Sequence, residues 1–207
     1  MLVTDRSSDG SASMRAQRGF TLTELMVTVA VAGVLAMMAV PNMRSFVQNN
    51  RLSSASNDLL RSFNLARTEA IKHQTNVVVC AVADPTLATP ACSYGAFNGW
   101  IVFQDTNLSW QWENAEPIFE RHELLDSSVT VKKDNDGIEM YVATGFASPA
   151  GAKIPTRNIL LCDSRGNQMV GTNSVERAVL IAASGRTRVS AVGTDVSTAA
   201  AAAGACP

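Results

Sequence analysis

The sequence has few of the residues that enzymes use for catalysis or for binding metals. His73 and His122 are its only histidines, and it has no G-x-S-x-G segment that would carry a nucleophilic serine. Its four cysteines form no C-x-x-C pair, which disfavours a zinc site. With 17 basic and 18 acidic residues, the net charge of −1 gives no overall attraction for nucleic acids. We therefore expect neither an enzyme nor a cofactor.

The remaining polar features have ordinary structural interpretations. His73 is expected at the end of a helix, where a cation offsets the helix dipole, and His122 in a charged, solvated strand end. Residues 134–137 begin like a calcium loop, but the twelfth position is Gly145 instead of glutamate. A hairpin turn is the preferred interpretation of this segment.

Charge is almost missing from one long stretch, residues 20–40, in which Glu24 is the only ionisable residue. A helix that spans a membrane needs about 20 mostly apolar residues, so the stretch is just long enough. An ionised carboxylate in hydrocarbon costs a few kcal/mol on insertion scales. Glu24 is therefore expected to have a partner.

The order of the N-terminal segments is unlike that of a secretory signal, in which the cleavage site follows the apolar run. Here the polar residues 1–19 come first, and the candidate cleavage site between Gly19 and Phe20 lies before the apolar run. Cleavage there would remove the leader and leave the apolar helix as the mature N-terminus. The new α-amine of Phe20 would then lie near Glu24, in the same chain or in a neighbour.

This arrangement resembles the class III signal of type IV pilins and pseudopilins. The matching residues are Gly19, Phe20, Thr21, Leu22, Glu24 and Leu25, with Pro41 further along. The resemblance implies that a prepilin peptidase cuts after Gly19 and methylates the amine of Phe20. It also implies that Glu24 pairs with the N-terminus of a neighbouring subunit during filament assembly. The alternative is an ordinary signal anchor in which Glu24 stands by chance.

The pattern beyond the apolar run predicts an α+β chain of the pilin type. Apolar residues at three- and four-residue steps between Met43 and Lys72 indicate an amphipathic continuation of the helix, with a kink or break at Pro41. The expected parts are a leader (1–19), a transmembrane or filament-core helix (20–41), a globular head (42–193) and a mobile Ala-rich tail (194–207).

Short β-branched runs separated by turn residues predict an antiparallel sheet packed on the helix. The expected strands are residues 77–82, 100–103, 117–120, 128–132, 138–142, 158–162, 177–181 and 188–190, with a long loop over 104–115.

The head resembles the GspH/FimT branch of the pilins. The segments that carry this resemblance are 65–72, 76–80, 99–105 and 184–189, whereas Trp110, Trp112 and the Ala-rich tail depart from the family pattern. The resemblance implies a minor pilin that is held in the inner membrane with its head in the periplasm and then built into a surface pilus. The implied partners are prepilin peptidase, the assembly platform, and major and minor pilins. The alternative is a minor pseudopilin of a type II secretion system.

An export signal favours an oxidising compartment, in which four cysteines can form two disulfides. Of the three possible pairings we prefer Cys80 with Cys92, which closes a short loop, and Cys162 with Cys206, which ties the tail to a strand. Buried free thiols are the alternative.

Arg186 and Arg188 form the strongest binding candidate in the head. If the segment after Gly185 is extended, both side chains project from one face, because strand side chains alternate. The planar guanidinium suits phosphate. In some members of the FimT branch a Gly-Arg-x-Arg segment binds DNA, and the resemblance implies the same here, helped by Lys153 or Arg157. The alternative is a solvated edge strand whose charges block pairing with other strands.

Overall fold

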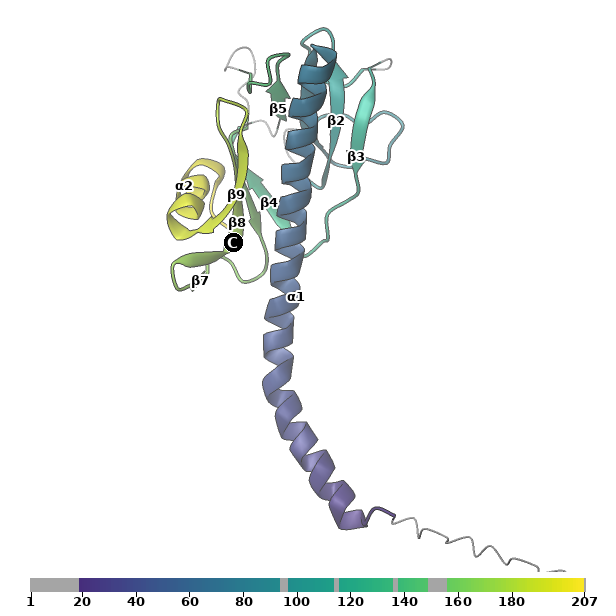
Figure 1. Cartoon of the computed structure of the whole chain (residues 1–207), viewed down its shortest axis with the longest axis vertical. Helices are drawn as coiled ribbons and strands as arrows, with labels where there is room; N and C mark the ends of the chain where they lie inside the picture. The colour runs from purple at the N-terminus through teal and green to yellow at the C-terminus, as the bar shows by residue number, and fades with distance from the viewer. Residues whose placement is uncertain (1–18, 94–96, 114–115, 136–137, 149–155, 207) are drawn as a thin grey trace, which may run out of the picture. The chain divides into compact units, whose positions relative to one another are not determined.

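The computed structural model describes residues 19–93, 97–113, 116–135, 138–148 and 156–206 (Figure 1). The chain divides into two compact units, Met1–Arg44 and Ser45–Pro207. Helix α1 (Leu22–His73) runs from the first unit into the second. Residues 1–18 of the leader and Lys153 lie outside the described residues.

The beginning of α1 is set by its own sequence. Thr21 stands at the N-cap, and its Oγ1 accepts a hydrogen bond from the backbone N–H of Glu24 at 3.2 Å. A threonine followed by a glutamate three residues later is a capping-box pattern. The large apolar side chains of the described part of this unit are exposed, from Phe20 to Met43. By length and composition the helix is apolar enough to cross a membrane.

Pro41 lies inside α1, whose backbone is helical on both sides of it. The helix is therefore not broken at Pro41, which was one of the two outcomes expected there. The kink stays a prediction.

The strands form two antiparallel sheets instead of the one expected. The first sheet has the order β3-β2-β1-β5, with β1 (Asn76–Val82), β2 (Gly99–Asp105), β3 (Ile118–His122) and β5 (Ile138–Tyr141). The second has the order β4-β6-β8-β7, with β9 also paired to β8; its strands are β4 (Thr130–Lys133), β6 (Asn158–Cys162), β7 (Met169–Val170), β8 (Asn173–Ile181) and β9 (Thr187–Val192).

The central core joins one face of α1 to the inner faces of both sheets. From α1 it contains the helical stripe that the sequence predicted, which is confirmed: Leu52, Ala55, Leu59, Phe63, Ala66 and Ala70. The strands contribute alternate residues, such as Val77 and Val79 from β1 and Ile159 and Leu161 from β6. The residues between these, which point to the opposite faces of β1 and β6, belong to two further apolar clusters. Both faces of each sheet are therefore apolar.

The hairpin predicted at residues 134–137 is wrong. The strand before it, β4, pairs with β6 in the second sheet, whereas the strand after it, β5, pairs with β1 in the first. The segment thus carries the chain from one sheet to the other. Local sequence marks where the chain turns, but not which sheet receives the next strand.

A buried ion pair lies between the two sheets. Arg157, just before β6, places its Nη1 2.7 Å from Oε2 of Glu139 on β5. The Glu139 side chain is fully buried, and burial raises its pKa to about 8, although the Arg157 guanidinium acts in the opposite direction. Thr156 and Arg157 also donate hydrogen bonds to Asp134, to its backbone carbonyl and its side chain respectively.

The prediction of a mobile tail is wrong. Residues Gly193–Ala203 form helix α2, which packs on the second sheet with Val196 and Ala199 buried (Figure 1). Alanine has the highest intrinsic helix propensity, so the same composition that suggested low complexity also supports a helix. The head therefore extends to the end of the described chain.

We expect Ala199→Asp to release α2 from the second sheet, because it places a charge at a fully buried position. Limited proteolysis should then cut within residues 193–203. Ala201→Asp is the matched control, since it makes the same change at an exposed position of the same helix. Equal protease resistance of the two variants would contradict the docking of α2.

The Glu139 pKa predicts that stability falls as pH rises from about 5 to 8. In this range the folded state keeps a proton that the unfolded chain, with an ordinary pKa of 4.5, has released. The slope is at most about 1.4 kcal/mol per pH unit. Glu139→Gln should flatten this dependence in thermal unfolding, while Glu123→Gln at an exposed site should leave it unchanged. An unchanged slope in Glu139→Gln would count against the assignment.

Candidate functional site

The candidate processing site lies at the exposed start of α1. Phe20 is 81% exposed, and Gly19 directly precedes it. A Cβ built on Gly19 would meet no atom within 4 Å. The fold of the described residues therefore gives no steric reason for a glycine at this position.

Glu24 lies in the first turn of α1, and its side chain is exposed. Among the described residues it forms no ion pair with a basic side chain. The N-terminal end of a helix favours a carboxylate, by about 0.3–1 kcal/mol at an exposed position. The site thus presents one unpaired negative charge at the tip of an apolar helix.

The second candidate site, around Arg186 and Arg188, begins at a tight turn between β8 and β9. Gly185 has φ of +77°, a conformation that L side chains rarely adopt. A Cβ there would also clash with the carbonyl oxygen of Gly145. Arg186 follows in this turn and is exposed, while Arg188 lies on β9. The glycine is thus required by the backbone that presents both arginines.

Arg188 is held by an acidic partner that the tail supplies. Its Nη1 and Nη2 lie 2.6 and 3.1 Å from the two carboxylate oxygens of Asp195, in the first turn of α2. The hydroxyl of Ser190 also donates to Asp195, at 2.6 Å. The Arg188 guanidinium, followed by this hydroxyl, lowers the pKa of Asp195 to about 2. Asp195 therefore offsets the charge of Arg188, one of the three predicted DNA-binding arginines.

An open hollow of about 670 Å³ brings three of the predicted residues together. Arg157, Arg186 and Arg188 all line it, and so do Asp195 and Thr198 of α2. The Arg157 guanidinium also contacts Glu139 and the backbone carbonyl of Ser148, so its position is fixed by the fold. Arg186 is the arginine of this hollow that forms no ion pair with any described residue.

The two histidines differ in their surroundings. His73 lies at the end of α1 as predicted, with its Nε2 3.0 Å from Glu69. His122 was expected to be solvated, and this is wrong: its ring stacks on Trp100 with centroids 3.7 Å apart, and its side chain is 18% exposed. The Nε1–H of Trp100 also donates a hydrogen bond to the Ser62 hydroxyl, with 2.8 Å between the nitrogen and the oxygen.

The loop between β2 and β3, which departs from the family pattern, packs into the outer core of the first sheet. Trp110 is buried there despite a φ of +63°, and Trp112 is partly buried beside it. The carboxylate of Asp105 accepts hydrogen bonds from the backbone N–H groups of Ser109 and Trp110. This buried acceptor fixes the loop, so the tryptophans fill space and are not an exposed binding surface.

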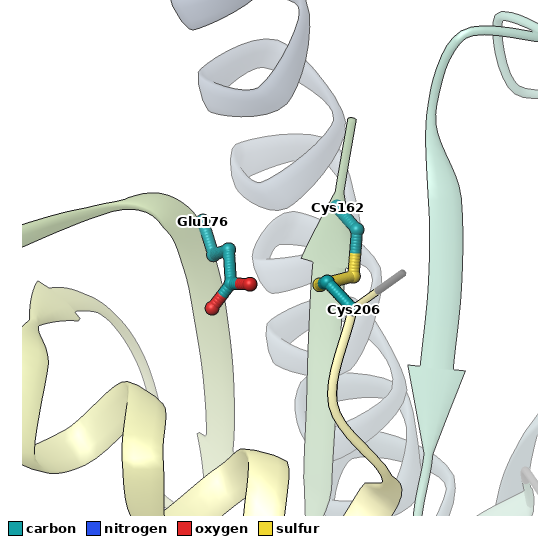
Figure 2. A group of neighbouring side chains, drawn as sticks. All are labelled: Cys162, Glu176 and Cys206. Carbon is teal, nitrogen blue, oxygen red and sulfur yellow. A yellow bond between two sulfur atoms is a disulfide. The ribbon is translucent and has the colours of Figure 1, made fainter. Parts of the chain in front are cut away.

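Two disulfides join Cys80 to Cys92 and Cys162 to Cys206, which is the preferred pairing. The second lies beside the buried carboxylate of Glu176 (Figure 2). Sequence reasoning missed Glu176, because the strand was expected to begin at Arg177. From Asn173 to Arg177 only Val175 is apolar, so no alternating pattern marks the true start of the strand in the sequence.

Comparison with known proteins shows short similarities to pilins. The chain is 33% identical over 73 residues to a fimbrial protein of Pseudomonas aeruginosa, covering 35% of the chain and 47% of that protein. It is 39% identical over 46 residues to the type IV major alpha-pilin of Moraxella bovis, covering 22% and 29% respectively. The matches thus span about half or less of these relatives. The type IV minor pilin FimU of P. aeruginosa (strain PAO1) aligns with a TM-score of 0.48 at 18% identity, over 70% of this chain and 91% of FimU.

Two family models match the chain itself. The prokaryotic N-terminal methylation motif covers residues 14–40, which include the proposed cleavage site and Glu24. The model of the type II transport protein GspH covers residues 55–185, from the amphipathic half of α1 to the β8–β9 turn. This second match spans more than half of the sequence, and it includes the end of α1 and strands β1 to β8. The chain therefore belongs to the GspH family of pilin-like proteins that carry an N-terminal methylation motif.

Proposed function

We propose that this protein is a minor subunit of a type IV pilus, made as a prepilin and cut between Gly19 and Phe20. The match to the methylation motif over residues 14–40 carries the proposal. The exposed position of Phe20, and a glycine that the described fold does not require, support it. Prepilin peptidase would then methylate the new amine of Phe20.

The exposed apolar half of α1 supports membrane anchoring before assembly. The proposed location is the inner membrane, with a single span and the head in the periplasm, followed by the cell surface once the pilus forms. Burial of apolar surface contributes about 25 cal/mol per Å² removed from water. The helix passes from lipid into the filament core, so packing and the charge on Glu24 must supply much of the specificity. The proposed partners are the assembly platform and other major and minor pilins.

A second candidate is a minor pseudopilin of a type II secretion system. It is favoured by the description of the family whose model matches residues 55–185, the type II transport protein GspH. Deletion of the gene, scored in parallel for twitching, transformation and exoprotein release, separates the two. Loss of exoprotein release with normal twitching would support the pseudopilin instead.

Glu24→Ala should leave cleavage intact but reduce incorporation into the filament. The carboxylate is unpaired among the described residues, and its proposed partner is the freed amine of Phe20 in a neighbouring subunit. The measurement compares mature protein in sheared filaments with mature protein in the membrane. Thr28→Ala is the matched control, because the Thr28 hydroxyl only donates to the carbonyl of Leu25 in its own helix. Normal incorporation of Glu24→Ala would refute the pairing.

We further propose that the hollow lined by Arg186 and Arg188 contacts the phosphates of DNA. Arg186 is exposed and has no acidic partner among the described residues. Arg188 must exchange Asp195 for a phosphate, which makes the site weaker than two free arginines would be. The salt bridge of Arg188 thus acts against binding, although it holds α2 next to the hollow.

Asp195→Asn should therefore raise DNA affinity, and Arg186→Ala combined with Arg188→Ala should lower it. Removing one arginine that binds a phosphate reduces the slope of log affinity against log salt concentration by about 1. Gel-shift titrations at several salt concentrations measure both effects. Arg61→Ala, which removes an exposed arginine elsewhere on the head, is the control. Unchanged DNA affinity in the double variant would reject the DNA site. The arginines would then be explained as charges that keep an edge strand from pairing with other strands.

A further inference from the structure

Three side chains with metal-binding chemistry meet where β6, β8 and the end of the chain lie together. Cys162 comes from β6, Glu176 from β8, and Cys206 follows α2 (Figure 2). Their sulfur and carboxylate oxygen atoms all lie within 4.8 Å of one another. Cys162 and Glu176 are buried, and Cys206 is partly buried. These residues are far apart in the sequence, so only the fold brings them together.

The Glu176 carboxylate lacks the partners that a buried acid normally has. The residue is 1% exposed, and its Oε1 has no hydrogen-bond donor among the described residues. Its Oε2 has only a long contact of 3.4 Å with the hydroxyl of Ser174. A buried polar group without a partner costs about 1–3 kcal/mol, and more if it is charged. The neighbouring disulfide cannot reduce this cost, because its sulfurs carry no proton to donate.

A path from solvent leads to this group. Glu176 lines a hollow of about 300 Å³ between α2 and the β7–β8 hairpin, whose other walls are mostly apolar. Ala205, the residue next to Cys206, lines the same hollow. A small ion can therefore approach Glu176 from this hollow without unfolding the sheet.

We propose that, when Cys162 and Cys206 are thiols, they bind one zinc ion together with Glu176. Zinc accepts thiolate ligands at about 2.3 Å and carboxylate oxygens at about 2.0–2.2 Å. The Cα atoms of the two cysteines are 5.8 Å apart, so both sulfurs reach a common ion by side-chain rotation. The partly exposed side of Cys206 leaves the fourth position to water.

The thiol and disulfide forms are related by a balanced exchange. A dithiol reductant gives two electrons and two protons to the Cys162–Cys206 disulfide and becomes a disulfide itself. Zinc then replaces the two thiol protons, which are released to solvent, because thiolate is the ligand. A disulfide oxidant reverses this sequence: it takes two electrons from the two thiolates and two protons from solvent and becomes a dithiol, while the Cys162–Cys206 disulfide forms again and the ion is expelled. In either form Cys206 stays joined to β6, so the end of the chain is held against the second sheet before and after oxidation.

The test uses the full chain in detergent, reduced with a phosphine and kept free of oxygen. The variant Cys80→Ser with Cys92→Ser retains the dithiol beside Glu176, whereas Cys162→Ser with Cys206→Ser retains the other one. Zinc is titrated in competition with a chromophoric chelator, and cobalt reports thiolate ligands by its charge-transfer absorption. We expect one equivalent of zinc in the first variant and none in the second. Equal binding by both variants, or by the oxidised protein, would overturn the proposal.

Glu176→Gln tests the third ligand, because it keeps the shape of the side chain but removes the charge. We expect it to weaken zinc binding about tenfold or more, since even hydrogen-bonding partners of metal ligands change affinity by about 10–100-fold. An unchanged affinity would remove Glu176 from the site. If the serine variants do not fold, alkylation of the reduced native chain replaces them: zinc should protect Cys162 and Cys206 but not Cys80 and Cys92. Equal protection of all four cysteines would reject the site.

Discussion

One face of α1 covers two sheets at once, and the rest of the head depends on this packing. Leu52, Leu59 and Phe63 meet alternate residues of β1 and β6 in a single core. Side chains return to the same face every 3.6 residues in a helix and every two residues in a strand. A continuous apolar stripe along α1 is therefore needed to pack against both sheets. The other faces of the sheets then need their own cover. The β2–β3 loop with Trp110 covers the first sheet, and α2 with Val196 covers the second.

The same helix has two kinds of surface along its length. Beyond Ser45 it is amphipathic and belongs to the head, whereas its first half has exposed apolar side chains all round. A helix that is apolar on every side must be surrounded by lipid or by other helices. The helix dipole alone favours Glu24 at this position only weakly, so a nearby positive charge would add to its stabilisation. In the proposed filament, the freed amine of a processed neighbouring subunit supplies this charge.

The fold also decides which charges of the head remain free. Arg157 is drawn into the space between the sheets by Glu139, and Arg188 is paired with Asp195 at the start of α2. Arg186, presented by the turn at Gly185, keeps an exposed charge. The arginines that the sequence suggested as one basic patch therefore differ in exposure and pairing, and Arg186 is the most available of them. In the same way, α2 places Cys206 beside Cys162 and next to the Glu176 carboxylate, whose Oε1 has no hydrogen-bond donor among the described residues.

The sequence alone determined the features that depend on local pattern. The apolar and amphipathic halves of α1 and most strands follow from residue spacing and composition, because these depend on neighbours along the chain. The cysteine pairing was only a preference among three, because it joins segments that are distant in the sequence. The tertiary structure alone decided the division into two sheets, the docking of α2, the stacking of His122 on Trp100 and the burial of Glu176. It also decided the pairing of Arg188 with Asp195. Each of these depends on contacts between distant segments, and their free energy is set by burial and charge that exist only once the head has folded.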